Sequence, residues 1–254
     1  MKSKIIIILI TLFTGSFGFS QINQVDSRGK KHGKWIVKHK NSKNVKYKGT
    51  FNHGTPEGIF LFYYKSGKIK VKNKYLAGGK NSFALSYHEN GKKMSFGKFV
   101  NEKRDSTWKY YNELGRLISQ ENYRNGELQG KSLVFYAFNK QAGDDRPRVM
   151  EFSWYENGER EGDWYKFYNN GKKMAEGNYV SGNLEGKVTY YFATGQKKSI
   201  THYKHGLKRG WSFVYDRSGK QLSKQFYMNG NIMEGKQLKD YLTRLKKRRK
   251  ANKK

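Results

Sequence analysis

Residues 162–186 read GDWYKFYNNGKKMAEGNYVSGNLEG, and this stretch decides the fold. It contains one turn signal at Asn170-Gly171 and a second around Gly182. Asn-Gly between apolar stretches is typical of a β-hairpin, because the favoured two-residue turn needs a positive φ at both central residues. The stretch therefore predicts two short strands, each of an ordinary length of about six residues, and two turns.

The same pattern recurs outward from this stretch in both directions. Successive copies are 24 residues apart, except for one interval of 32 residues. A glycine follows the recurrent aromatic residue by three positions in every copy but one, where Glu102 stands instead. The aromatic column is Phe51, Tyr75, Phe99, Tyr123, Tyr155, Tyr179, Tyr203 and Tyr227. A fixed short period of this kind indicates a repeat architecture.

Residues 33–235 accordingly predict an all-β fold, an elongated single-layer antiparallel meander of about eight 24-residue β-hairpin repeats. This implies roughly sixteen strands, with the aromatic column forming a ladder along one face, since equivalent residues lie about 10 Å apart, two strands away. If the Asn-Gly pair forms the whole loop, Phe167 faces Met174 and Trp164 faces Gly177. Stability in such an array comes from contacts between neighbouring repeats.

Residues 1–20 have the features of a secretory signal peptide. Lys2 and Lys4 precede an apolar run of nine residues, and small residues stand at Gly18 and Ser20 before Gln21. The run is too short to span a bilayer. We therefore expect cleavage and export to the periplasm, the outer cell surface or the medium. A buried first strand and a membrane anchor are the alternatives. Residues 21–32 are expected to form an N-terminal linker.

Residues 236–254 predict a short helix and a basic tail. Leu238, Tyr241, Leu242 and Leu245 recur at helical spacing, and this apolar stripe is expected to cap the last hairpin. The tail that follows is a candidate site for an anionic surface, and its alternative is a disordered, solubilising end. The candidate residues are Arg244, Lys246, Lys247, Arg248, Arg249 and Lys250.

The charge balance limits the choice of partner. The chain has 52 Lys and Arg against 20 Asp and Glu, a formal net charge of +32. Such an excess favours an acidic protein, anionic envelope lipid, lipopolysaccharide or an acidic polymer as partner, with solubility alone as the competing interpretation. Nucleic acid is not an expected partner. The eight extra residues of the long interval fall near 139–148, which is either a recognition loop or a neutral insertion.

No catalytic motif interrupts the repeats. The chain has no cysteine, and its six histidines occupy different repeat positions. Neither a nucleophile elbow, a phosphate-binding loop nor a dinucleotide fingerprint is present. The recurrent carboxylates near the second turn, such as Glu161 and Glu185, follow the repeat and are interpreted as structural. We expect no enzyme activity, no cofactor and no metal.

The repeat, once aligned, resembles the MORN-repeat variant. Gly162, Trp164, Tyr168, Gly171 and Tyr179 stand at the positions of its pattern. More narrowly, the chain resembles the bacterial YwqK-type repeat proteins, which are described as toxin–antitoxin antitoxins. The resemblance implies β-hairpin modules linked with protein interaction, dimerisation and lipid binding. It also implies neutralisation of a partner by binding, and no catalytic residues.

Overall fold

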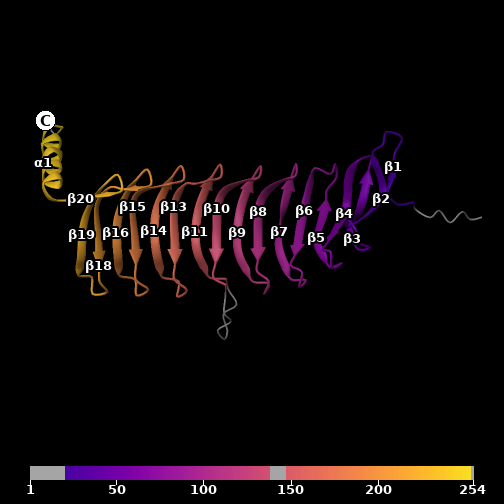
Figure 1. The fold of residues 1–254 in the computed structure, drawn as a ribbon, viewed down its shortest axis with the longest axis horizontal. Coiled ribbons are helices and arrows are strands. Elements are labelled where there is room, and N and C mark those ends of the chain that lie inside the picture. Colours follow the sequence, from indigo (N-terminus) through magenta and orange to yellow (C-terminus); the bar gives the residue numbers. More distant parts are fainter. Residues whose placement is uncertain (1–20, 138–146, 253–254) are drawn as a thin grey trace, which may run out of the picture.

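A computed structural model describes residues 21–137 and 147–252 of the protein. The chain forms one long antiparallel sheet whose strands run across the long axis of the molecule, with a single helix at one end (Figure 1). The helix is α1 (Gly235–Ala251). The strands are β1 (Gln24–Val25), β2 (Lys31–Lys38), β3 (Val45–Asn52), β4 (Thr55–Tyr63), β5 (Ile69–Tyr75), β6 (Asn81–Tyr87), β7 (Lys93–Val100), β8 (Lys103–Tyr111), β9 (Leu117–Arg124), β10 (Glu127–Phe135), β11 (Val149–Glu156), β12 (Glu159–Arg160), β13 (Gly162–Phe167), β14 (Lys173–Val180), β15 (Asn183–Tyr191), β16 (Lys197–Lys204), β17 (Leu207–Lys208), β18 (Gly210–Tyr215), β19 (Gln221–Met228) and β20 (Asn231–Met233).

The predicted all-β meander is confirmed. Each strand pairs with its neighbours in the sequence, and every pairing is antiparallel. Two of the expected strands are each interrupted next to a glycine with positive φ, Gly162 or Gly210. The two pieces of each strand, β12 with β13 and β17 with β18, therefore occupy one place in the sheet and are counted as one strand position. With these counted once, and the short end strands β1 and β20 set aside, sixteen long strand positions remain.

The loop at Asn170-Gly171 differs from the predicted two-residue turn. Only Gly171 has a positive φ, of 81°. The loop is closed from Tyr168 to Lys172, whose N–H and C=O groups bond at 2.8 Å, and it therefore has three residues. Three-residue loops of this kind combine an ordinary turn with a left-handed glycine and a bulge. The bulge shifts the register, so Phe167 pairs with Lys173, and the predicted pairing with Met174 is wrong. The predicted pairing of Trp164 with Gly177 lies beyond the bulge and is confirmed.

The second turn of each repeat is the two-residue type. Ser181 and Gly182 both have positive φ, of 46° and 76°. The turn also bonds to the preceding repeat, since the Gly182 N–H donates to the Arg160 carbonyl at 2.9 Å. The Glu161 carboxylate accepts the Ser181 N–H at 2.7 Å, and Glu185 does the same for the next turn. These recurrent carboxylates therefore hold neighbouring repeats together, as their position in the repeat predicted.

Side chains also connect neighbouring repeats at the opposite rim, where the three-residue loops lie. The Tyr64 hydroxyl donates to the Tyr87 carbonyl at 2.7 Å, and Tyr168 donates to Tyr191 at the same distance. Each of these pairs spans 23 residues of sequence. Every such bond joins one repeat to the next, and the array is therefore stabilised by nearest-neighbour contacts at both rims.

One face of the sheet holds most of the buried side chains, and we call it the aromatic face. Its largest buried residues are Phe60, Trp108 and Trp164, at 2%, 3% and 5% exposure. They contact the predicted aromatic column: Phe99 meets Trp108 edge-on with ring centroids 4.9 Å apart, and Tyr179 lies tilted against Trp164. Glycines leave the room for these rings: a Cβ added at Gly97 would lie 2.1 Å from Trp108. The predicted ladder along one face is therefore present.

The expected linker at residues 21–32 instead belongs to the sheet. β1 pairs with the start of β2, where Gln24 stands opposite His32. Just before β1, the Asn23 amide accepts the Ile36 N–H at 2.7 Å and donates to the Ile36 carbonyl at 2.8 Å. The Asn23 side chain thereby makes the two hydrogen bonds that the backbone of a neighbouring strand would make. Its φ of 60° is one that asparagine tolerates better than most residues. The first edge of the sheet is covered in this way.

Candidate functional site

The face opposite the aromatic face is rich in lysine over its N-terminal half. Strand pairing places Lys48, Leu61, Lys72 and Leu85 side by side in one row across β3 to β6. A parallel row runs from Ile59 through Lys74 and Phe83 to Lys98. We call this surface of β2 to β10 the lysine face. Its lysines are Lys34, Lys48, Lys72, Lys74, Lys98, Lys109 and Lys131.

Large apolar side chains lie exposed between these lysines. Ile59 is 49% exposed, and Phe83 and Phe96 are 39% and 42% exposed. The two phenylalanine rings stack nearly parallel, with centroids 6.3 Å apart. Aromatic residues surrounded by polar ones are typical of binding surfaces, while single exposed apolar residues are ordinary. The stacked pair between two rows of lysines therefore identifies this face as a candidate interface.

The lysines of this face form no ion pair in the part of the chain that the structure describes, although Lys98 stands opposite Asp105 in the strand register. Its ion pairs there are at Asp26–His53, Glu151 with Arg160 and Lys166, and Lys173–Glu176. Two carboxylates, Glu57 and Asp105, share the face near the rim of two-residue turns, and neither forms an ion pair among the described residues. The lysine face therefore presents unneutralised positive charge.

The C-terminal half of the same face has a mixed charge. Lys173 donates to Glu176 at 2.8 Å, and the Tyr191 hydroxyl donates to the same carboxylate at 2.5 Å. These two hydrogen bonds hold the pKa of Glu176 below its usual range. Burial, together with the bond to Glu176, raises the pKa of Tyr191 to about 12. Glu176 thereby neutralises part of the positive charge of this half, and we place the candidate interface in the N-terminal half, where exposed aromatic rings lie between the lysines.

The cations of the aromatic face are also engaged internally. Arg160 donates to the hydroxyls of Tyr155 and Tyr179 at 3.2 and 3.1 Å, and to Glu151 at 3.0 Å. Burial lowers the pKa of Arg160, but the bonds to the two tyrosines outweigh it and raise the pKa above its usual range. Arg104 lies over the ring of Trp108 at 5.1 Å in the same manner. These cations therefore contribute to the packing of the aromatic face.

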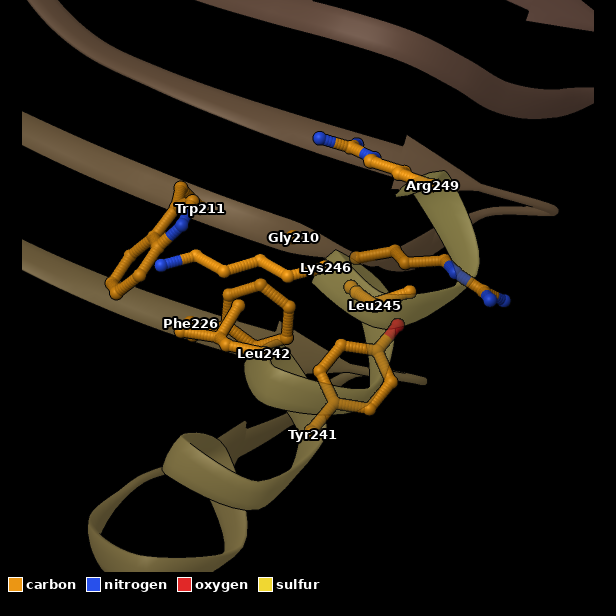
Figure 2. A pocket seen from close by; sticks show the side chains of 9 residues that line it. Gly210, Trp211, Phe226, Tyr241, Leu242, Leu245, Lys246 and Arg249 are labelled. Carbon is orange, nitrogen blue, oxygen red and sulfur yellow. The ribbon is translucent and has the colours of Figure 1, made fainter. Parts of the chain in front are cut away.

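All six predicted basic site residues lie on α1, which continues to Ala251. The predicted frayed tail is therefore helical over these positions. The predicted apolar stripe is the half-buried side of the helix, and Tyr241 packs against Phe226 with ring centroids 5.6 Å apart. Lys246 and Arg249 line a pocket between α1 and the last hairpin (Figure 2). Arg244, Lys247, Arg248 and Lys250 are exposed and do not line it.

Two further features of the sequence concern metal binding and the insertion. Within residues 21–137 and 147–252, no three His, Asp or Glu side chains are grouped so that they could hold a metal ion. The segment at 139–148, a recognition loop or a neutral insertion, falls mostly outside the described residues. No helix of the described chain is long and apolar enough to span a membrane.

Comparison with known families supports the repeat assignment. Residues 56–76, 160–181 and 184–205 match the MORN repeat variant. Each matched segment spans parts of consecutive strands and the turns between them. No curated protein matches the chain. The match is to the repeat itself, and the narrower YwqK-type assignment stays a prediction.

Proposed function

We propose that this protein is an exported, non-enzymatic interaction scaffold whose lysine face binds an extended acidic segment of a partner protein. MORN repeats are generally associated with binding or protein interaction, and proteins built from them are typically non-enzymatic. The observation that carries the proposal is the group of unpaired lysines around the stacked rings of Phe83 and Phe96.

The spacing of the lysine face suits an extended partner. Neighbouring strands lie about 4.8 Å apart, so equivalent positions of successive repeats are about 10 Å apart. A chain in the polyproline II conformation rises about 3.1 Å per residue with three residues per turn, so every third residue points to the same side, about 9 Å further along, and would meet the next repeat. A segment with an acidic residue at every third position, lying along the long axis of the sheet, would meet Lys74 and then Lys98.

Export is part of this proposal and rests on residues 1–20, which lie outside the described chain. The basic start, the apolar run and the small residues Gly18 and Ser20 support cleavage before Gln21. N-terminal sequencing of the protein from its own cells is expected to begin at Gln21. A sequence that begins at Met1 would contradict export. An antitoxin-like role is a special case of the same proposal, in which the bound partner is a toxin.

The experiment measures how the mature chain binds a labelled peptide with glutamate at every third position. The variant Lys72→Glu/Lys98→Glu/Lys109→Glu reverses three charges of the lysine face. The control, Lys40→Glu/Lys43→Glu/Lys65→Glu, reverses three exposed lysines near the rim of three-residue loops. We expect the face variant to bind about 100-fold more weakly, since three surface pairs are worth about 1 kcal/mol each. The control is expected to bind nearly as well as the unaltered chain.

The outcomes separate the competing functions. Equal loss in both variants would mean that net charge alone drives binding, against the proposal. Failure of the unaltered chain to bind the peptide would also contradict it. If lipopolysaccharide binds through the same three lysines while the peptide does not, the partner is an anionic envelope polymer instead. Raising the salt concentration should weaken the polymer complex most, because its contacts are all electrostatic.

A further inference from the structure

A pocket separates α1 from the sheet at the C-terminal end of the molecule. It has a volume of about 530 Å³, within the range of about 300–1,000 Å³ that is usual for small-molecule sites. Trp211 and Phe226 form one wall, and Leu242 and Leu245 of α1 form the other (Figure 2). The two aromatic rings meet edge to face, with centroids 5.2 Å apart.

The sequence explains why the helix does not close over this wall. The apolar stripe of α1 is only half-buried, and no residue of the helix is fully buried. Tyr241 contacts the sheet through Phe226 and holds the helix in place from there. The next turn carries Leu242 and Leu245, which face Trp211 across the pocket. The cavity is therefore a gap between two apolar surfaces held together at one end.

Three cations stand around this apolar gap. Arg209 comes from the sheet, and Lys246 and Arg249 come from the helix. Lys246 points along the pocket toward Trp211 (Figure 2). The pocket lining contains no acidic residue, and none of the three cations has an ion pair within the described chain. Cations around an apolar cavity, with no carboxylate in its lining, give it a positive potential that favours a ligand with an anionic end.

We propose that this pocket binds an anionic amphiphile, a molecule with an apolar chain and a single carboxylate or phosphate at one end. The apolar chain would lie between the aromatic wall and the leucines of α1, where its burial is favourable. The anionic end would meet the positive charge of Lys246, which points along the pocket, and Arg209 and Arg249 would add to the positive potential around it. This site is separate from the lysine face, which lies on β2 to β10 at the other half of the sheet.

The test uses decanoate, in its monomeric range, as the probe of the mature chain. The pocket variant is Lys246→Gln/Arg249→Gln. Its control is Lys247→Gln/Arg248→Gln, which makes the same changes of residue type and charge on the same helix but outside the pocket. We expect the pocket variant to bind decanoate at least tenfold more weakly by calorimetry, and the control to change less than threefold. Decanol, which lacks the charge, is expected to bind more weakly than decanoate.

Each other result has a defined meaning. No binding of decanoate by the unaltered chain, or equal loss in both variants, would overturn the proposal. The variant Leu242→Ser/Leu245→Ser should also weaken binding, and unchanged affinity there would contradict an apolar site. Vesicles that contain anionic lipid distinguish a free amphiphile from a membrane. Adhesion that depends equally on both pairs of cations would mean that α1 lies on the membrane surface and that the pocket is not the site.

Two controls keep the result interpretable. Thermal unfolding of each variant shows whether it is folded, and glutamine is a good helix former that should leave α1 intact. The charge-reversed variant of the lysine face should bind decanoate as the unaltered chain does. Failure of the pocket proposal would therefore leave the scaffold proposal standing, and the reverse also holds.

Discussion

Removing twelve residues from this protein is expected to harm it more than removing twenty-four. Deletion of residues 163–186 takes out one complete repeat and joins Gly162 to Lys187. Residues that become neighbours after this deletion occupy equivalent places in their repeats. Glu161 can therefore accept the His205 N–H, as Glu185 does in the full chain. Deletion of residues 163–174 removes half a repeat and joins Gly162 to Ala175. Every later turn then lies on the opposite rim from its counterparts in the preceding repeats.

The half-repeat deletion loses the contacts between repeats on both sides of the junction. Both deletions remove Trp164, but the complete deletion brings the apolar Val188 to its position, whereas the half deletion brings Glu176 there, and an unpaired charge is costly to bury. The half deletion also breaks the hydrogen bonds between neighbouring loops at the junction. These bonds form only where turns of the same type are neighbours on the same rim of the sheet. We expect the complete deletion to lower the melting temperature by a few degrees and the half deletion to lower it by more than 10 °C, because array stability depends on intact interfaces. Scanning calorimetry measures both.

A reversed ranking would contradict this expectation. If the shorter deletion melts at the higher temperature, the repeats are not coupled through their rims. A single cooperative transition in both variants, at equal temperatures, would lead to the same conclusion.

A single methyl group at Gly97 is expected to destabilise the whole central part of the sheet. The added carbon would lie 2.1 Å from Trp108, and the ring has little freedom to move because it is 3% exposed. Its indole N–H also donates to the Lys98 carbonyl at 3.0 Å. Overpacking of this kind costs about 3 kcal/mol. We therefore expect Gly97→Ala to reduce the free energy of unfolding by about that amount in chemical denaturation.

The second half of this experiment is a double-mutant cycle. Trp108→Ala is expected to cost about 3–5 kcal/mol by itself, because it leaves a large cavity. In that background the methyl group at residue 97 has room, and its cost should fall well below its cost beside the intact ring. Additive effects of the two substitutions would show that Gly97 is not present to accommodate the ring. Gly97 does not have a positive φ, so alanine can adopt its backbone conformation. The loss of stability in Gly97→Ala would therefore come from the clash with the Trp108 ring and not from backbone strain.

Much of the fold follows from the period of the sequence. The aromatic column, the turn glycines and the pairing of Trp164 with Gly177 all predicted the meander. The loop type was not predicted, because the same Asn-Gly dipeptide fits a two-residue turn and the end of a three-residue loop. A signal was present in two other repeats at the residue that precedes the loop, where Asn112 and Asp216 accept N–H groups two residues later. Such side chains are typical of the longer turn.

The candidate interface could not be predicted in the same way. Net charge indicates an anionic partner but does not show which lysines lack a carboxylate. That requires the pairing of the strands, which brings Tyr191 of β15 to Glu176 of β14 and places Lys72 and Lys74 opposite apolar residues of β4 and β6. The basic segment near the end was visible in the sequence, but its division into pocket-lining and solvent-facing residues depends on how Tyr241 docks on Phe226. The apolar stripe predicted that the helix docks on the last hairpin, but not how far the helix stands from the sheet beyond Tyr241.

The orientation of the strands has a mechanical consequence. The described chain begins at one end of the long axis and ends at the other, and the strands lie across that axis (Figure 1). Tension between the two ends therefore pulls along the hydrogen bonds of the sheet, so that only the outermost strand carries the load at any moment. The array should peel open at low force, and each step should release one repeat of chain. An anchored copy would then act as an extensible tether that lengthens in equal increments and regains its shape when the pull stops.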